Sequence, residues 1–272
     1  MRALLQLCLT CCCLLFGAAG PLSAQAQPLA KPGSPSVETI LSNVVARAHA
    51  VASQKDPVYA YKQTTVIEEL DSKGTVKERK EKLYDVKLIG GLPRAKLVLV
   101  NGKQLTGKAL EEELERDRKR AQRFEDKKSG KDPNVEVLIS RELVSRYIFQ
   151  LKGLEEHNGR PAWVLTFKPR SDDLPINKMQ DRVLNKLSGL VWVDCEDFEV
   201  ARADLHLASR VTLFGGFAGA LDIFDLEMNR ARSPFGTWYN QSGSLRIEGR
   251  KLFSPIRFKA SESADEFQPF KP

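Results

Sequence analysis

The chain has 272 residues, 42% of them hydrophobic and 28% charged, with a formal net charge of +7. Four of its five cysteines fall within the first 13 residues, so Cys195 has no partner for an internal disulfide, and a buried core must hold the fold. A chain of this length can bury such a core as one large β domain or as two ordinary ones. The basic balance favours anionic lipid head groups or envelope polymers as partners, whereas the mixing of both charge signs also suits a merely soluble surface.

Residues 1–26 predict a secretory signal peptide. Arg2 precedes an apolar run from Ala3 to Phe16, and Ala24 to Ala26 forms an A-x-A cleavage pattern. A membrane anchor would need about 20 apolar residues, more than this run offers. Cleavage as a lipoprotein before Cys12 or Cys13 is disfavoured, because the preceding residue is itself a cysteine. We therefore expect a mature periplasmic chain that begins near Gln27, a setting that excludes nucleic acid as a partner.

A short lead-in and a helix follow the predicted cleavage site. Residues 27–34 contain Pro and Gly without periodicity, which predicts a flexible arm. Ser34 is placed to cap a helix and Pro35 to occupy its first position. The helical spacing then predicts one apolar face, made of Val37, Ile40, Leu41, Val44, Val45, Ala48 and Val51.

Three strand-like runs and a charged helix come next. Residues 58–70, 75–89 and 94–100 are typical of antiparallel strands, and Asn101-Gly102 predicts a tight hairpin turn. Residues 107–128 predict a helix that is acidic early and basic late, as the helix dipole favours. Its few apolar anchors predict a thin buried stripe: Leu110, Leu114, Ala121 and Phe124. This helix is either a lid over the sheet or a surface insertion, and residues 129–133 predict a loop.

The second half of the chain predicts further strands and a frayed tail at 265–272. Asn158-Gly159 is a second hairpin signal, and residues 179–187 suit a short helix. The predicted strands are 143–151, 163–167, 190–194, 198–207, 211–217, 220–228, 236–239, 244–253 and 256–261. Together these elements predict an α+β fold, a strongly curved antiparallel sheet packed on helices.

The sequence offers little for catalysis, for a metal or for a cofactor. His49, His157 and His206 are the three histidines, and none stands at metal-ligand spacing from another His or Cys. Nucleophile-elbow, phosphate-loop and dinucleotide motifs are absent from the sequence. A Ser-His-Asp arrangement stays open, because such residues meet only in space. We expect a protein that is not an enzyme and needs neither cofactor nor metal.

Two acidic clusters and the lone cysteine carry alternatives. Residues 194–197 could contribute to a calcium site, but their place between two strands favours a solvated turn, and Asp172-Asp173 has the same interpretation. Acidic neighbours raise the pKa expected for Cys195, which predicts an unreactive thiol.

Aromatic and leucine side chains recur at alternate positions of the predicted strands. Such alternation places many of them on one face, as an ordinary core or as the lining of an apolar cleft for acyl chains. The candidate cavity residues are Tyr59, Tyr61, Leu97, Leu99, Phe149, Trp163, Phe167 and Trp192.

The motifs of the second half resemble a known family. Tyr147-x-Phe149-x-Leu151-x-Gly153 is followed by GRPAWVLTFKP at 159–169, GLVWVD at 189–194 and FEVAR at 198–202. This series resembles the LolA-like superfamily of periplasmic lipoprotein carriers and outer-membrane lipoprotein-sorting proteins. Trp163, Phe167 and Trp192 match family positions on the barrel strands, whereas the charged helix at 107–128 departs from the compact carriers.

The resemblance implies an unclosed β-barrel at 35–264, with helices covering its concave face and a hydrophobic cavity that holds lipid or lipoprotein acyl chains. It implies binding without catalysis, in outer-membrane lipoprotein sorting, with peripheral membrane contact. The alternative is an envelope sensor or adaptor of the same fold that binds a protein partner through its charged helix.

Overall fold

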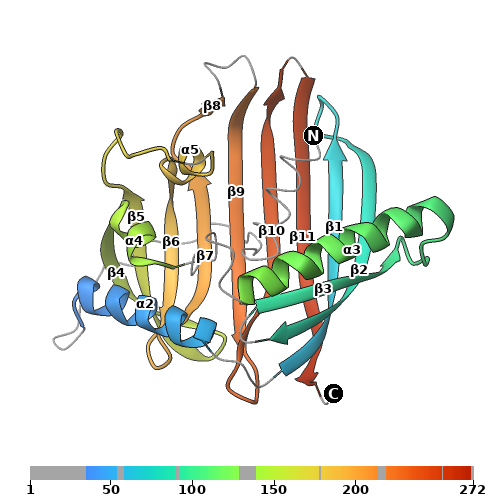
Figure 1. Ribbon diagram of the computed structural model, residues 1–272. Coiled ribbons are helices and arrows are strands. Elements are labelled where there is room, and N and C mark those ends of the chain that lie inside the picture. The colour runs from blue at the N-terminus through green and yellow to red at the C-terminus, as the bar shows by residue number, and fades with distance from the viewer. Residues whose placement is uncertain are drawn as a thin grey trace.

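The computed structural model describes residues 35–53, 58–89, 92–128, 139–177, 179–213, 219–252 and 254–270 (Figure 1). The predicted signal peptide, the lead-in at 27–34 and the loop at 129–133 lie outside the described residues. Within the described part, no helix is both long and apolar enough to cross a membrane.

One antiparallel sheet and a few helices make up the fold. The helices are α2 (Val37–Ser53), α3 (Gly107–Lys128), α4 (Arg141–Ser145) and α5 (Asp181–Leu184). The strands are β1 (Val58–Leu70), β2 (Val76–Ile89), β3 (Leu92–Val100), β4 (Tyr147–His157), β5 (Arg160–Pro169), β6 (Leu187–Asp194), β7 (Val200–Leu207), β8 (Val211–Leu213), β9 (Gly219–Arg232), β10 (Trp238–Lys251) and β11 (Ser254–Pro269). The predicted antiparallel sheet with few helices is therefore confirmed.

The sheet is open rather than closed. Its strand order is β3-β2-β1-β11-β10-β9-β7-β6-β5-β4, and β8 pairs only with β9. The first strand of the chain thus pairs with the last one, which joins the N-terminal meander to the C-terminal one. The edge strands β3 and β4 each have one neighbour in this order, so the described strands do not close into a barrel.

The two predicted Asn-Gly turns are confirmed. Asn101 and Gly102 have φ values of 50° and 73°, and Asn158 and Gly159 have values of 50° and 74°. Two successive positive φ values belong to the tight hairpin turn whose twist matches that of the flanking strands. These two turns fix the register of β4 with β5 and end β3 beside β2.

Several strand ends differ from the prediction because long-range pairing extends them. The runs predicted at 236–239 and 244–253 form the single strand β10, and α4 occupies the start of the run predicted at 143–151. The predicted tail at 265–272 is wrong as far as Pro269, since β11 pairs with β1 up to Tyr59. The sequence of this segment did not predict a strand, because the strand that pairs with it lies some two hundred residues earlier in the chain.

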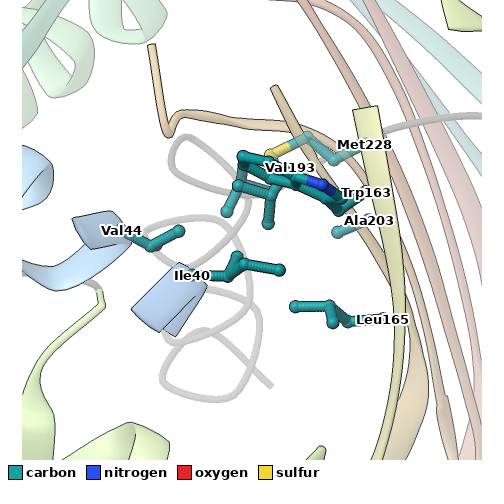
Figure 2. Close-up of a cluster of buried hydrophobic side chains, with 8 residues drawn as sticks. Ile40, Val44, Trp163, Leu165, Val193, Ala203 and Met228 are labelled. Atoms are coloured by element: carbon teal, nitrogen blue, oxygen red, sulfur yellow. The ribbon is translucent and has the colours of Figure 1, made fainter. Parts of the chain in front are cut away.

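Helix α2 begins two residues later than its predicted cap suggests. The hydroxyl Oγ of Ser36 accepts a hydrogen bond from the backbone N–H of Thr39 at 3.2 Å, so Ser36 caps the helix. Ile40 is 0% exposed and packs, with Val44, on side chains of the sheet (Figure 2). Those partners are Trp163, Leu165, Val193, Val200, Ala203 and Met228.

Helix α3 has its predicted bounds, but two of its predicted apolar anchors do not lie on its buried face. Leu110 is 42% exposed and Leu114 is 47% exposed, so the predicted buried stripe is wrong for these two residues. The Glu113 side chain is instead only 12% exposed and accepts a hydrogen bond from Arg120 Nη2 at 2.6 Å. Lys82 of β2 lies within the electrostatic field of these two charges, and burial lowers its pKa. A charged seam therefore turns toward the sheet, and the two leucines turn toward solvent.

Candidate functional site

One face of the sheet carries both long helices, and we call it the helix-bearing face (Figure 1). A nearly continuous apolar band crosses it from β4 to β10. The cluster around Ile40 and the cluster around Tyr147 both pack against Leu205, and so does the cluster of Leu226, Leu245 and Ile247. Shared contacts at Leu205 therefore join three clusters into one apolar surface.

A separate aromatic cluster lies on the same face, where β1, β10 and β11 meet. The rings of Tyr239 and Phe267 stack with centroids 4.2 Å apart, and Tyr59 stacks on Phe267 at 5.1 Å. Tyr61 lies 5.8 Å from Phe267, and all of these rings pack near Val86. Phe235, in the turn between β9 and β10, extends the cluster to the exposed surface beside Tyr59.

The strand register decides which candidate cavity residues share this face. Tyr59 and Tyr61 lie in the aromatic cluster. Leu97 pairs with Tyr84, and Tyr84 packs on this cluster. The candidates of the second half divide in the same way. Phe149, Trp163 and Phe167 belong to the clusters under and beside α2.

Leu99 and Trp192 lie on the opposite face, so the prediction of a shared face is wrong for them. A β-bulge shifts the register between β2 and β3, so that Leu83 pairs with Leu99 while the next residue, Tyr84, pairs with Leu97. The extra residue, Val98, turns Leu97 and Leu99 to opposite faces. Trp192 pairs with Val164 and packs with it and with Ala162, away from Trp163.

The opposite face covers Trp192 with charged side chains. Its indole Nε1 donates to Glu155 Oε2 at 2.8 Å, and the guanidinium of Arg202 lies 4.7 Å from the ring centroid. Arg202 also pairs with Asp204 and Glu227, each at 2.8 Å. Trp192 is therefore a buried structural residue under an ion-pair layer, a position that suits no acyl chain.

Glu262 on β11 is a site residue that sequence reasoning missed. Its neighbours on the strand and the same face are Ala260, which packs on the Leu245 cluster, and Ala264, which belongs to the aromatic cluster. Its carboxylate Oε2 accepts a hydrogen bond from Gln63 Nε2 at 2.7 Å. Burial raises the pKa of Glu262 to about 8. A single acidic group thus lies at the junction of two apolar clusters.

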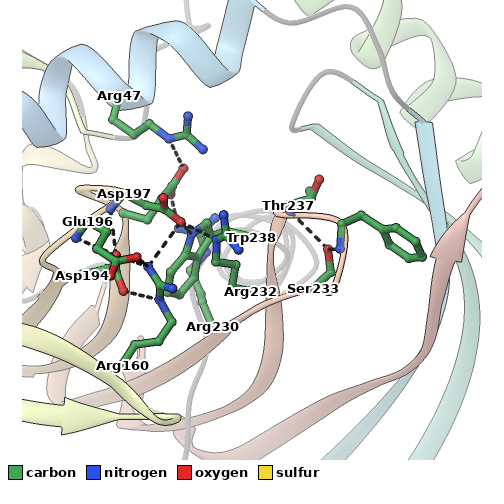
Figure 3. A network of polar contacts seen from close by, with 12 residues as sticks. Arg47, Arg160, Asp194, Glu196, Asp197, Arg230, Arg232, Ser233, Thr237 and Trp238 are labelled. Atoms are coloured by element: carbon green, nitrogen blue, oxygen red, sulfur yellow. Dashed lines mark hydrogen bonds and ion pairs between the residues drawn. The ribbon is translucent and has the colours of Figure 1, made fainter.

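A polar network holds α2 and the turns at one end of the sheet together (Figure 3). Arg47 of α2 donates from Nε to Glu199 Oε1 at 2.9 Å, and Arg230 of β9 donates to Glu199 Oε2 at 2.7 Å. Asp197 accepts from Arg232 Nε and from Trp238 Nε1, each at 2.7 Å. The short segment between β6 and β7 therefore ties the helix to the β9–β10 hairpin.

The acidic cluster at 194–197 belongs to this network. Asp194 is 1% exposed, so the predicted solvated turn is wrong for this carboxylate. The carboxylate oxygens of Asp194 accept hydrogen bonds from Arg160 and from the backbone N–H groups of Glu196 and Asp197. Within the described residues, no group of His, Cys, Asp and Glu could hold a metal ion. Burial, with the charge of Asp194, raises the pKa of the Cys195 thiol, in the direction expected for an unreactive cysteine.

The open question of a Ser-His-Asp arrangement meets one partial match. Ser188 Oγ and His206 Nε2 lie 3.1 Å apart on the opposite face, and Asp225 pairs with His206 across β7 and β9. His206 and Asp225 are exposed, and no hydrogen bond within the described structure joins them. A nucleophile needs an oriented base in a shielded site, and these exposed groups on a strand surface lack both features.

A surface hollow of about 290 Å³ lies at the turn between β1 and β2, near the start of β11. Its lining is polar at most positions, and none of the candidate cavity residues contributes to it. The lining residues are Glu69, Leu70, Asp71, Ser72, Lys77, Pro255 and Arg257.

No protein-family model and no curated protein matches the chain. Solved structures do match it. A DUF1329 family protein from Desulfovibrio piger has 11% identity and a TM-score of 0.33, over 86% of this chain and 92% of its own. A putative outer membrane lipoprotein-sorting protein domain from Vibrio parahaemolyticus has 10% identity and a TM-score of 0.33, over 86% and 93%. A LolA superfamily protein from Nitrosomonas europaea has 10% identity and a TM-score of 0.27, over 85% and 94%. Solved structures from the superfamily that the strand motifs resemble thus match this chain over most of its length.

Proposed function

We propose that this protein is a non-enzymatic periplasmic binder or carrier of lipid or lipoprotein acyl chains that acts in outer-membrane lipoprotein sorting. The observation that carries the proposal is the apolar band on the helix-bearing face. It runs from β4 to β10 through shared contacts at Leu205 and is followed by the aromatic cluster around Phe267. Partly exposed apolar side chains beside these buried clusters, such as Phe224 and Phe258, suit the packing of an extended hydrocarbon chain.

The energetics of burial support a binder that forms no covalent bond to its ligand. Each buried methylene of an acyl chain contributes about 0.8 kcal/mol, so a long chain is retained without catalysis. In this proposal the ligand lies on the helix-bearing face of the open sheet. The candidates that keep a lining role are those on this face: Tyr59, Tyr61, Leu97, Phe149, Trp163 and Phe167.

A matched pair of variants tests this function. Phe258 is half-buried on the helix-bearing face and packs on the Leu245 cluster, whereas Leu83 is half-buried on the opposite face. Protein purified from the periplasm should carry extractable lipid and should bind fluorescent fatty acids. Phe258→Ser should weaken that binding about tenfold, and Leu83→Ser should leave it unchanged. The absence of both co-purified lipid and fatty-acid binding would rule out the proposal.

The orientation of α3 favours a second candidate function, an envelope adaptor. Leu110 and Leu114 are exposed on a helix that is otherwise strongly charged, and an exposed apolar pair of this kind suits a protein partner. Double substitution Leu110→Ser with Leu114→Ser should abolish partner capture in envelope cross-linking and leave acyl-chain binding intact. Loss of acyl-chain binding without loss of capture would contradict the adaptor function and assign the two leucines to the ligand.

A further inference from the structure

Glu262 lies on the helix-bearing face among small side chains. Its partner across β10 is Gly243, and its partner across β1 is Thr65. Along β11 its neighbours on the same face are Ala260 and Ala264. Because these residues have short side chains or none, they do not fully cover the side chain of Glu262, which is partly exposed.

Gln63 orients this carboxyl group. Gln63 is buried and pairs with Ala264 of β11, two residue pairs from Glu262 and therefore on the same face. Its amide Nε2 donates to Glu262 Oε2, and this is the hydrogen bond that the described structure gives to the Glu262 side chain. One carboxyl oxygen is thus held by protein, and the other is left for a further partner.

No cation of the described structure lies within ion-pair distance of Glu262. On the same face, the register of β1 and β2 places the charged groups Glu69, Glu78, Lys80 and Lys82, and β1 separates the two lysines from β11. Glu113, Arg116 and Arg120 of α3 surround Lys82 rather than Glu262. The strand β10 contributes Gly243 and Leu245 beside Glu262 and no charge. Desolvation therefore dominates here, and with a pKa of about 8 the Glu262 carboxyl is largely protonated at neutral pH.

We propose that Glu262, oriented by Gln63, is the head-group contact of the acyl-binding face and donates a hydrogen bond to the ester or amide carbonyl of the ligand. This proposal rests on the proposed function and names the ligand class, a neutral acyl ester or acyl amide. The hydrocarbon chain then lies along Ala260 and Phe258, which are partly exposed beside the buried Leu245 and Ile247. A protonated carboxyl is a strong donor in an apolar site, and a carbonyl oxygen is the acceptor that completes it.

The same geometry selects against two other head groups. A free fatty acid at neutral pH would have to bury its carboxylate in this apolar site, which desolvation opposes, so a neutral ester or amide is favoured over it. An alkylammonium would require Glu262 to ionise among apolar side chains, which desolvation opposes.

The test uses one fluorescent chain with three head groups. Dansylaminoundecanoyl methylamide, the free acid and the corresponding alkylamine are titrated into the mature wild-type chain at about pH 6.5 and pH 9.5. We expect the methylamide to bind about tenfold more weakly at the higher pH, as Glu262 ionises and loses its proton. Glu262→Gln keeps an N–H donor at every pH, so its affinity should be the same at both values. Glu262→Leu should bind the methylamide about tenfold more weakly already at the lower pH.

Each outcome decides the proposal. Methylamide binding that is independent of pH in the wild-type chain and unaffected by Glu262→Leu overturns the head-group role but leaves acyl binding in place. Tighter binding of the alkylamine at high pH overturns it in favour of a cation site. Failure of every probe to bind the wild-type chain contradicts the proposed function itself. Circular dichroism confirms that both variants are folded, and Glu262→Gln serves as the decisive variant if Glu262→Leu is not.

Discussion

The guanidinium of Arg160 donates two hydrogen bonds to the carboxylate of Asp194, from Nε to Oδ2 at 2.7 Å and from Nη2 to Oδ1 at 2.8 Å. Asp194 ends β6, and Arg160 begins β5, so this bidentate pair joins the hairpin turn at 158–159 to the segment that leads into β7. Bidentate pairs of this kind add geometric specificity to ionic attraction. The pair holds the segment between β6 and β7 in place. Glu199 of that segment forms the ion pair with Arg47 that anchors α2.

Asp194→Asn should lower the free energy of unfolding at pH 7 by roughly 2–4 kcal/mol, because it leaves the Arg160 charge without its main partner. Burial opposes ionisation of Asp194, but the hydrogen bonds from Arg160 and from the backbone N–H groups of Asp197 and Glu196 outweigh it and lower its pKa. A lowered pKa contributes stability above the unfolded-state value, and this stability is lost as the pH falls below about 4. Urea midpoints measured from pH 7 downward should therefore fall more steeply for the wild-type chain than for the variant. Parallel profiles would contradict the assignment.

Gly189→Ala should destabilise the protein by roughly 3 kcal/mol or more. A Cβ atom at Gly189 would lie 1.9 Å from the backbone carbonyl oxygen of Asp204 on β7, and backbone cannot yield as a flexible side chain does. Gly153 is the matched control, since a Cβ there meets nothing within 4 Å. Gly153→Ala should change the unfolding free energy by less than about 1 kcal/mol. Thermal unfolding of the two variants compares them directly, and equal midpoints would be inconsistent with a close approach of β6 and β7.

The contact between Arg47 and Glu199 should contribute about 1 kcal/mol of coupling energy to the docking of α2. The Arg47 side chain is partly exposed, which limits the value, but Glu199 is mostly buried and is also held by Arg230. A double-mutant cycle with Arg47→Ala and Glu199→Gln, followed by urea unfolding, measures the coupling. Additive effects of the two substitutions would show that α2 depends on its apolar contacts at Ile40 alone.

Glu262→Gln should remove a pH dependence of stability at alkaline pH. Burial raises the pKa of Glu262 to about 8, above its ordinary value of 4.5, so the folded state holds the proton more tightly than the unfolded state does. Stability is then lost as the pH rises through this window and levels off above about 8. At pH 9 the variant should be more stable than the wild-type chain by roughly 4 kcal/mol if the two are similar at pH 5, since each pKa unit is worth about 1.36 kcal/mol. Equal melting temperatures at pH 9 would show that Glu262 ionises without penalty.

The candidate site could be predicted only in part, and two residues show why. Trp163 and Trp192 both stand in alternating strands, yet they lie on opposite faces. A tight turn fixes the register of β4 with β5, but the long segment at 170–186 that connects β5 to β6 fixes none. Because one residue of register changes the face of every side chain, alternation could not assign Trp192. The bulge at Val98 separates Leu97 from Leu99 for a related reason.

The sequence did not predict Glu262 as a site residue, because its neighbours in sequence are typical of an exposed strand. It stands in a run of small and charged residues, SESADE at 261–266, which gives no sign of an apolar site. Only the pairing of β11 with β1 and β10 brings Gln63, Thr65 and Gly243 around it. Predicting this buried charge would have required knowing beforehand that β11 pairs with β1 and β10.

The sequence by itself determined the local features of this protein. The positive φ values at the two Asn-Gly turns and the bounds of α3 follow from preferences of neighbouring residues, so short windows were enough to predict them. The tertiary structure alone decided the face on which Trp192 lies, the burial of Asp194, the exposure of Leu110 and Leu114, and the neighbours of Glu262. Each of these depends on contacts between segments far apart in the chain, as between β1 and β11, and the burial of a side chain is set by those contacts rather than by its neighbours in sequence.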